Sequence, residues 1–350
     1  EMSFVQRDDV LALMEDLFNY VFKNVMNTTL PAHFRRITYH DAMNTYGCDK
    51  PDLRFDIPMK DASPWAKGST FGLFNDILSD GGYIKYVVAP KTEGHDFTRK
   101  YITELEDAAK IYGAQGLCWM KVENGTLSGG VSKYFVGKEK EVLEETGAKD
   151  GDIILIVAHK DWKKCCNSLG AVRSKLGANL GLIRPGYEFC WIIDFPLFEY
   201  NEDEGHWEAA HHMFSMPQVE YLDTLESNPG AVKGDLYDLV LNGYELASIH
   251  DIELQKRIFR ICNIPDDVAQ HKFGFLLDAF KFSPPPHGGI APGIDRLCMI
   301  CAGQSSIKEV IAFPKNTAAL SPMDDSPNWV DQSQLDELGL IIDPKKKTTK

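Results

Sequence analysis

A short glycine-bearing stretch, residues 287–297, constrains the fold of this chain more than any other part. It reads His-Gly-Gly-Ile-Ala-Pro-Gly-Ile-Asp-Arg-Leu, and an apolar run, Leu297 to Cys301, continues it. Glycines remove side-chain bulk and let another group approach the backbone closely. The pattern therefore predicts a strand of small residues that leads into a buried helix. Arg296 is the cation of this junction, and its planar fork suits paired phosphate oxygens. An ordinary strand with a surface arginine is the alternative reading.

The flanking sequence predicts alternating helices and strands. Residues from Arg7 to Val25 have helical spacing, with Val10, Leu13, Met14, Leu17, Val21 and Val25 expected on the apolar face. Residues 55–164 alternate strands and helices, and we expect this segment to fold alone around its own core. Residues 237–246 read as a strand with a break near Gly243.

Asp238 and Glu245 are the carboxylates that the sequence favours as metal ligands. Residues of odd separation on a straight strand point to opposite faces. A bulge near Gly243 would bring both carboxylates to one face, where they suit Mg²⁺ shared with nucleotide phosphates. Two ordinary surface acids are the alternative.

Composition excludes some functions. The formal net charge of −14 argues against a general nucleic-acid-binding surface, although a local basic patch stays compatible with it. The eight cysteines show no metal-ligand spacing, and we expect buried free thiols, Cys298 and Cys301 included. No apolar run reaches the roughly 18 residues of a membrane span. His211 and His212 are a second candidate pair, although one packed and one exposed histidine is the simpler reading.

Several motifs together resemble a known family. The stretch from Gly289 to Leu297 is similar to motif 3 of class II aminoacyl-tRNA synthetases. Further segments resemble bacterial-type aspartyl-tRNA synthetases in the order of that family: residues 46–54, 192–198, 210–214, 272–279 and 311–316.

The resemblance implies an α+β fold, with an antiparallel sheet flanked by helices and an inserted α+β domain of the GAD type. The implied divisions are 1–54 and 166–350 for the catalytic domain and 55–165 for the insertion. The implied reaction is activation of aspartate by ATP with Mg²⁺, followed by transfer to tRNA-Asp in the cytoplasm. Whether tRNA-Asn is also charged stays open. A homodimer is implied for the complete protein, with no membrane partner.

The resemblance also implies roles for particular residues. Arg296 would act in catalysis, and Glu245, Gly293, Asp295 and Arg296 would bind ATP. Asp238 and Glu245 would hold the metal. Glu1, His211 and His212 would contact the aspartate substrate.

The sequence departs from the family in three places. It shows no N-terminal anticodon-binding barrel, it lacks motif 1 and most of motif 2, and Ala247 passes directly to Ser248 where the family has a glycine- and serine-rich run with an arginine. A pocket for a carboxylate without its cation is chemically incomplete. We therefore expect residues 1–350 alone to be inactive, either as a fragment of a synthetase or as a degenerate paralogue that serves as a binding scaffold.

Overall fold

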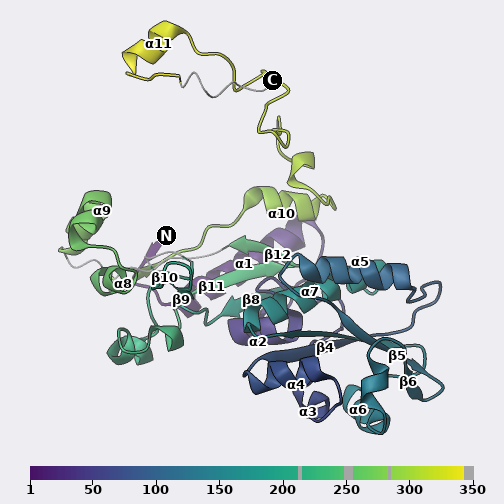
Figure 1. Cartoon of the computed structure of the whole chain (residues 1–350). Helices are drawn as coiled ribbons and strands as arrows, with labels where there is room; N and C mark the ends of the chain where they lie inside the picture. The colour runs from purple at the N-terminus through teal and green to yellow at the C-terminus, as the bar shows by residue number, and fades with distance from the viewer. Residues whose placement is uncertain (212–214, 248–254, 283–284, 343–350) are drawn as a thin grey trace. The chain divides into compact units, whose positions relative to one another are not determined.

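The computed structural model describes residues 1–211, 215–247, 255–282 and 285–342. It divides into two compact units, Glu1–Pro292 and Gly293–Lys350. The first unit contains two main sheets, and the second contains the helices α10 (Ile294–Cys301) and α11 (Gln332–Glu337) (Figure 1). Each unit is therefore described by itself.

The first sheet has four strands in the order β12-β11-β8-β2. Neighbours pair antiparallel except β2 and β8, which run parallel. The predicted antiparallel sheet therefore includes one parallel pair, at this edge. A parallel pair needs a long crossover, and here the whole second sheet lies between the two strands in sequence. The bounds are β2 (Arg35–Thr38), β8 (Phe189–Ile193), β11 (Tyr237–Leu241) and β12 (Tyr244–Ala247).

Helix α1 (Arg7–Val25) begins and ends where the sequence predicts. Gln6 and Asp9 form a capping box at its N-terminus, and Asp8 and Asp9 lie in the first turn, where carboxylates are favourable. The predicted apolar face is only partly right, because Leu13, Leu17 and Val25 are exposed. The buried face consists of Val10, Leu11, Met14, Phe18 and Phe22.

Aromatic packing explains that choice of face. The rings of Phe18, Phe22 and Phe34 lie 5.4, 5.3 and 4.4 Å from that of Phe189 on the central strand β8. Rings bury more apolar area than leucine side chains, so they decide which side of the helix faces the sheet. Glu15 is buried beside them, and its carboxylate accepts a hydrogen bond from the Trp191 indole at 2.9 Å.

The second sheet has five strands in the order β3-β4-β7-β5-β6, all antiparallel. Helices α5 and α7 cover one face, and α3, α4 and α6 cover the other (Figure 1). The central strand β7 is buried on both faces, so its residues Ile153 to Val157 form an unbroken apolar run. The bounds are β3 (Lys60–Asp61), α3 (Ser63–Ala66), α4 (Gly72–Ser79), β4 (Tyr83–Ala89), α5 (Arg99–Lys110), β5 (Cys118–Glu123), β6 (Thr126–Ser128), α6 (Glu139–Thr146), β7 (Ile153–His159) and α7 (Trp162–Asn179).

Helix α7 joins the two sheets. Its buried side chains from Cys165 to Leu176 belong to the core of the second sheet, which Met43 of helix α2 (Tyr39–Tyr46) also joins. Arg173 of α7 is buried and donates hydrogen bonds to the backbone carbonyls of Asp52, Phe55 and Ile57. The catalytic and inserted segments thus share packing across the predicted boundary at 165, and that boundary stays a prediction.

The remaining elements are short. None of the helices in the described ranges is long and apolar enough to cross a membrane. All eight cysteines are free, and Cys298 is exposed rather than buried as expected. The other strands and α-helices are β1 (Met2–Ser3), β9 (Phe198–Asn201), β10 (His206–Ala209), α8 (Gln255–Ile261), α9 (Asp266–Phe280) and β13 (His287–Gly288).

Candidate active site

The β11–β12 hairpin brings Asp238 and Glu245 to one face of the first sheet. Its turn is Asn242-Gly243, with φ of 54° and 86°, the left-handed values that a two-residue hairpin of this type requires. Val240 lies opposite Glu245 in the register, and cross-strand partners share a face. Asp238 lies two residues before Val240 and therefore on that same face.

The predicted route to this arrangement is wrong, although the pair itself forms. Gly243 is the second residue of a turn and not the site of a bulge. The register shift lies between Leu239 and Val240, away from the turn. Because the chain reverses between the two acids, their odd separation in sequence does not place them on opposite faces.

The environment of Asp238 disfavours its charge. Its side chain is buried, with 3% exposed. Burial, the largest cause, and the negative charges of Glu245 and Asp49 together raise the pKa of Asp238 to about 7, while Lys50 opposes them. A divalent cation between the two carboxylates would remove this repulsion, so the donor set fits Mg²⁺.

Lys50 is the cation that faces the pair. Its Nζ lies 2.8 Å from Oε2 of Glu245. The loop that carries Lys50 is held by Gly47, which ends α2 in the left-handed conformation with φ of 73°. A side chain at Gly47 would come within 2.5 Å of the Gly170 backbone in α7, so the loop and α7 approach too closely for any other residue.

The sequence interpretation missed Asp49 and Lys50 as site residues. Both lie in the motif of residues 46–54 that supports the resemblance, but the sequence alone assigned neither of them a role. Charged residues on a short loop that closes a helix were the available signal, because binding groups concentrate on loops held by a rigid scaffold.

His211 belongs to the same surroundings. Its ring packs edge-on against Phe195, with the centroids 4.8 Å apart. Partial burial lowers the pKa of His211, while Asp49, Glu199 and Glu245 oppose that shift. His211 is therefore neutral near pH 7 and can donate one hydrogen bond and accept another. His212, its predicted partner, lies outside the described residues.

Glu1, a predicted substrate contact, lies beside Gly289. Strand β1 pairs with β13, and a side chain at Gly289 would lie 2.8 Å from the Glu1 carboxylate. Tyr237 directly precedes Asp238 on β11. Its hydroxyl donates a hydrogen bond to the Gly289 carbonyl at 3.3 Å. Glu1 is thus connected to β11 through Gly289, and its contact with substrate stays a prediction.

Comparison with known proteins decides the family. The family described as tRNA synthetases class II (D, K and N) matches residues 1–317. The chain belongs to this family of class II tRNA synthetases. That assignment confirms the family resemblance and the α+β class.

Curated relatives narrow the comparison. The chain is 58% identical to the aspartate--tRNA(Asp/Asn) ligase of Treponema denticola over 349 residues, which are 98% of this chain and 59% of the relative. Proteins of the same name from Treponema pallidum strain Nichols and Borreliella burgdorferi strain ZS7 are 49% and 44% identical, and each match covers 98% of this chain. The chain spans 58–59% of the length of these three relatives.

Motif 3 of this class II synthetase chain is divided between the two units. His287 to Pro292 lie in the first unit, and Gly293, Asp295 and Arg296 lie in the second. Gly293 caps α10, and Asp295 and Arg296 occupy the first turn of that helix. The predicted helix is present, but the strand before it ends at Gly288, and only Met299 and Ile300 of α10 are buried. The approach of Arg296 to the carboxylate pair stays a prediction.

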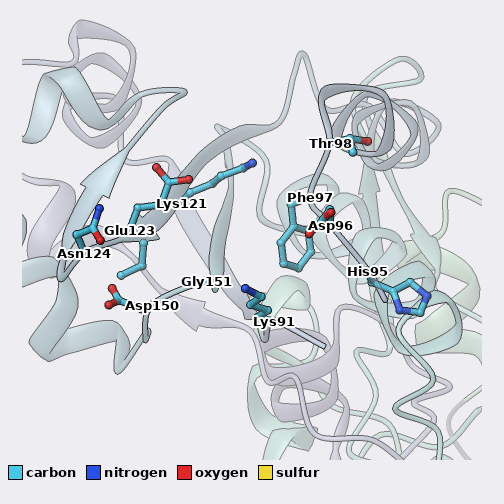
Figure 2. A pocket seen from close by; sticks show the side chains of 11 residues that line it. Lys91, His95, Asp96, Phe97, Thr98, Lys121, Glu123, Asn124, Asp150 and Gly151 are labelled. Carbon is cyan, nitrogen blue, oxygen red and sulfur yellow. The ribbon is translucent and has the colours of Figure 1, made fainter. Parts of the chain in front are cut away.

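A separate cavity of about 480 Å³ belongs to the second sheet of the synthetase chain. Figure 2 shows Lys91, Lys121, Glu123 and Asp150 among its lining side chains, with Asp96 and His95 opposite them. Both acids and bases line it, so its lining favours neither an anion nor a cation.

Proposed function

We propose that the complete protein is an aspartate–tRNA ligase that uses ATP and Mg²⁺. The observation that supports this most directly is the group of Asp238, Glu245 and Lys50 on one face of the hairpin, in a chain 58% identical to a protein of that name. The group supplies two things that the reaction needs. Two acids suit a metal-bound triphosphate, and one cation suits the carboxylate of an amino acid.

Each residue has a role that follows from its chemistry. Asp238 and Glu245 would hold Mg²⁺, which when bound neutralises the negative charge of the phosphates. Lys50 would meet the aspartate side chain, and it supplies a cation that the sequence interpretation found missing. His211, neutral near pH 7, would orient the substrate by hydrogen bonding. The reaction needs positioning and charge neutralisation, with no covalent enzyme intermediate.

Motif 3 would complete the site. We propose that Arg296 lies against the far phosphates of ATP, with Gly293 and Asp295 shaping the approach. The similarity of residues 289–297 to motif 3 supports this proposal.

The names of the relatives support a further proposal about the acceptor. Three relatives at 44–58% identity are named for both tRNA-Asp and tRNA-Asn, so we propose that this protein charges both. Aminoacylation of each purified tRNA by the complete protein tests this, and failure to charge tRNA-Asn contradicts it without affecting the aspartate reaction.

The central test is aspartate-dependent exchange of pyrophosphate into ATP by the complete protein. Glu245→Gln and Arg296→Ala should each slow adenylate formation at least about tenfold, because each removes a charged contact. Glu204→Gln on the exposed β9–β10 hairpin is the matched control and should leave the rate unchanged. A complete protein that shows no exchange, yet is folded, would favour the alternative of a scaffold without ligase activity.

A further inference from the structure

A second polar cavity lies where α2, the β3–β4 pair and the start of α7 meet. Its volume is about 620 Å³, and its lining includes His40, Lys60, Lys85 and Trp162. The elements that form it all belong to the first unit (Figure 1). None of these side chains takes part in the candidate active site.

Lys85 is the unusual member of this lining. It is only 7% exposed, yet the acceptor of its Nζ is the Asn44 carbonyl at the long distance of 3.5 Å. Asp61 lies opposite Lys85 in the register, but its Oδ1 accepts hydrogen bonds from the Ser63 amide and hydroxyl at 3.0 and 2.7 Å. Among the described residues, no carboxylate makes an ion pair with Lys85.

The neighbouring thiols do not supply the missing negative charge. Burial raises the pKa of Cys165 to about 12 and that of Cys166 to about 11. Both thiols are therefore neutral near pH 7. A buried ammonium without a counter-charge is unfavourable, so this position suits an anion that enters from solvent.

An aromatic surface adjoins the ammonium. The His40 ring stacks on Trp162, with the centroids 5.3 Å apart and an interplanar angle of 14°. Asn44 fixes the pair, because its amide oxygen accepts from the indole Nε1 at 3.0 Å and its nitrogen contacts the His40 ring at 3.0 Å. His40 is exposed, so the stack can receive another planar ring.

We propose that this cavity binds a nucleotide, with its phosphate at Lys85 and its base against the His40–Trp162 stack. Lys60 lies in the same lining and can assist the phosphate. Neither a phosphate alone nor a base alone accounts for both features. The cavity of Figure 2 lacks this combination, because its two lysines, Lys91 and Lys121, are not buried.

The test follows the ¹⁹F NMR signal of Trp162 during a ligand titration. The chain is labelled with 5-fluorotryptophan, and the Trp162 signal is assigned by its loss in Trp162→Phe. Titration with AMP, without Mg²⁺, should move this signal, whereas adenosine should not. Lys85→Met should weaken AMP binding at least about tenfold, because it removes a charged contact to phosphate. Lys140→Met, an exposed lysine on α6, is the control and should bind as the parent does.

A second measurement separates binding from folding. Lys85→Met removes a buried charge, so it should melt at the same or a higher temperature than the parent. If a 5′-phosphorylated RNA trinucleotide binds more tightly than AMP, the ligand is an RNA end. If the trinucleotide and AMP bind with equal affinity, the ligand is a free nucleotide. The proposal is overturned if neither AMP nor the trinucleotide moves the Trp162 signal. It is also overturned if folded Lys85→Met binds AMP with the same affinity as the parent. Neither result would bear on pyrophosphate exchange at the carboxylate pair.

Discussion

The Nζ of Lys50 lies 2.8 Å from Oε2 of Glu245, so a loop after α2 contributes a cation to the acids of the β11–β12 hairpin. The two residues are 195 positions apart in sequence. Between them lies the whole second sheet, which the chain completes before it returns to the first. Both charges shift the pKa of Asp238, because Glu245 raises it and Lys50 lowers it.

Replacing Lys50 by methionine should weaken aspartate binding in the complete protein. If Lys50 meets the substrate carboxylate, its loss removes a charge-assisted contact and should raise KM for aspartate at least about tenfold. The pKa of Asp238 should also rise, so the acid side of the pH–rate profile should move to higher pH. Pyrophosphate exchange across a pH series measures both effects, with Lys140→Met as control. A KM and a pH profile equal to those of the parent would contradict the assignment.

Replacing Asp238 by asparagine should stabilise the ligand-free protein above neutral pH. The pKa of Asp238 is about 7 in the folded protein, above the ordinary aspartate value of 3.8. Between these two pH values Asp238 is deprotonated in the unfolded state but still protonated in the folded state. Its contribution to the free energy of unfolding therefore falls as pH rises and is lowest above pH 7. Asp238→Asn should therefore gain roughly 2–4 kcal/mol at pH 8 and almost nothing at pH 4.

Urea unfolding at the two pH values measures this gain, with the exposed Asp16→Asn on α1 as control. Added Mg²⁺ should stabilise the parent at pH 8 and act less on Asp238→Asn. If the free energy of unfolding differs between the parent and Asp238→Asn by the same amount at pH 4 and pH 8, Asp238 is not desolvated.

The second sheet should fold alone only if it includes α7. Cys165, Cys166, Leu169, Val172 and Leu176 are all fully buried against it. Each buried apolar side chain is worth about 1.5–3 kcal/mol, and together they match the whole stability of an ordinary domain. Residues 55–182 should therefore unfold cooperatively on heating, whereas 55–164 should not. Equally cooperative transitions in both segments would show that α7 is dispensable and would support the boundary near 165.

Local sequence by itself determined much of this protein. The 3.6-residue period and the acids at its start located helix α1 to the residue at both ends. Gly47 marked the end of α2, because only a residue without a side chain takes the left-handed conformation at no cost. The motifs of residues 46–54 and 289–297 were sufficient for the family.

Tertiary structure decided how these pieces meet. The sequence indicated Asp238 and Glu245, and the local reversal at Asn242-Gly243 places both on one face. It did not indicate Lys50 or Lys85, because a lysine on a loop or strand is ordinary until its surroundings are known. The partner of Lys50 is 195 residues away, and the burial of Lys85 depends on the packing of α2, β4 and α7. Charge pairing and burial arise between distant segments, so local sequence patterns do not contain them.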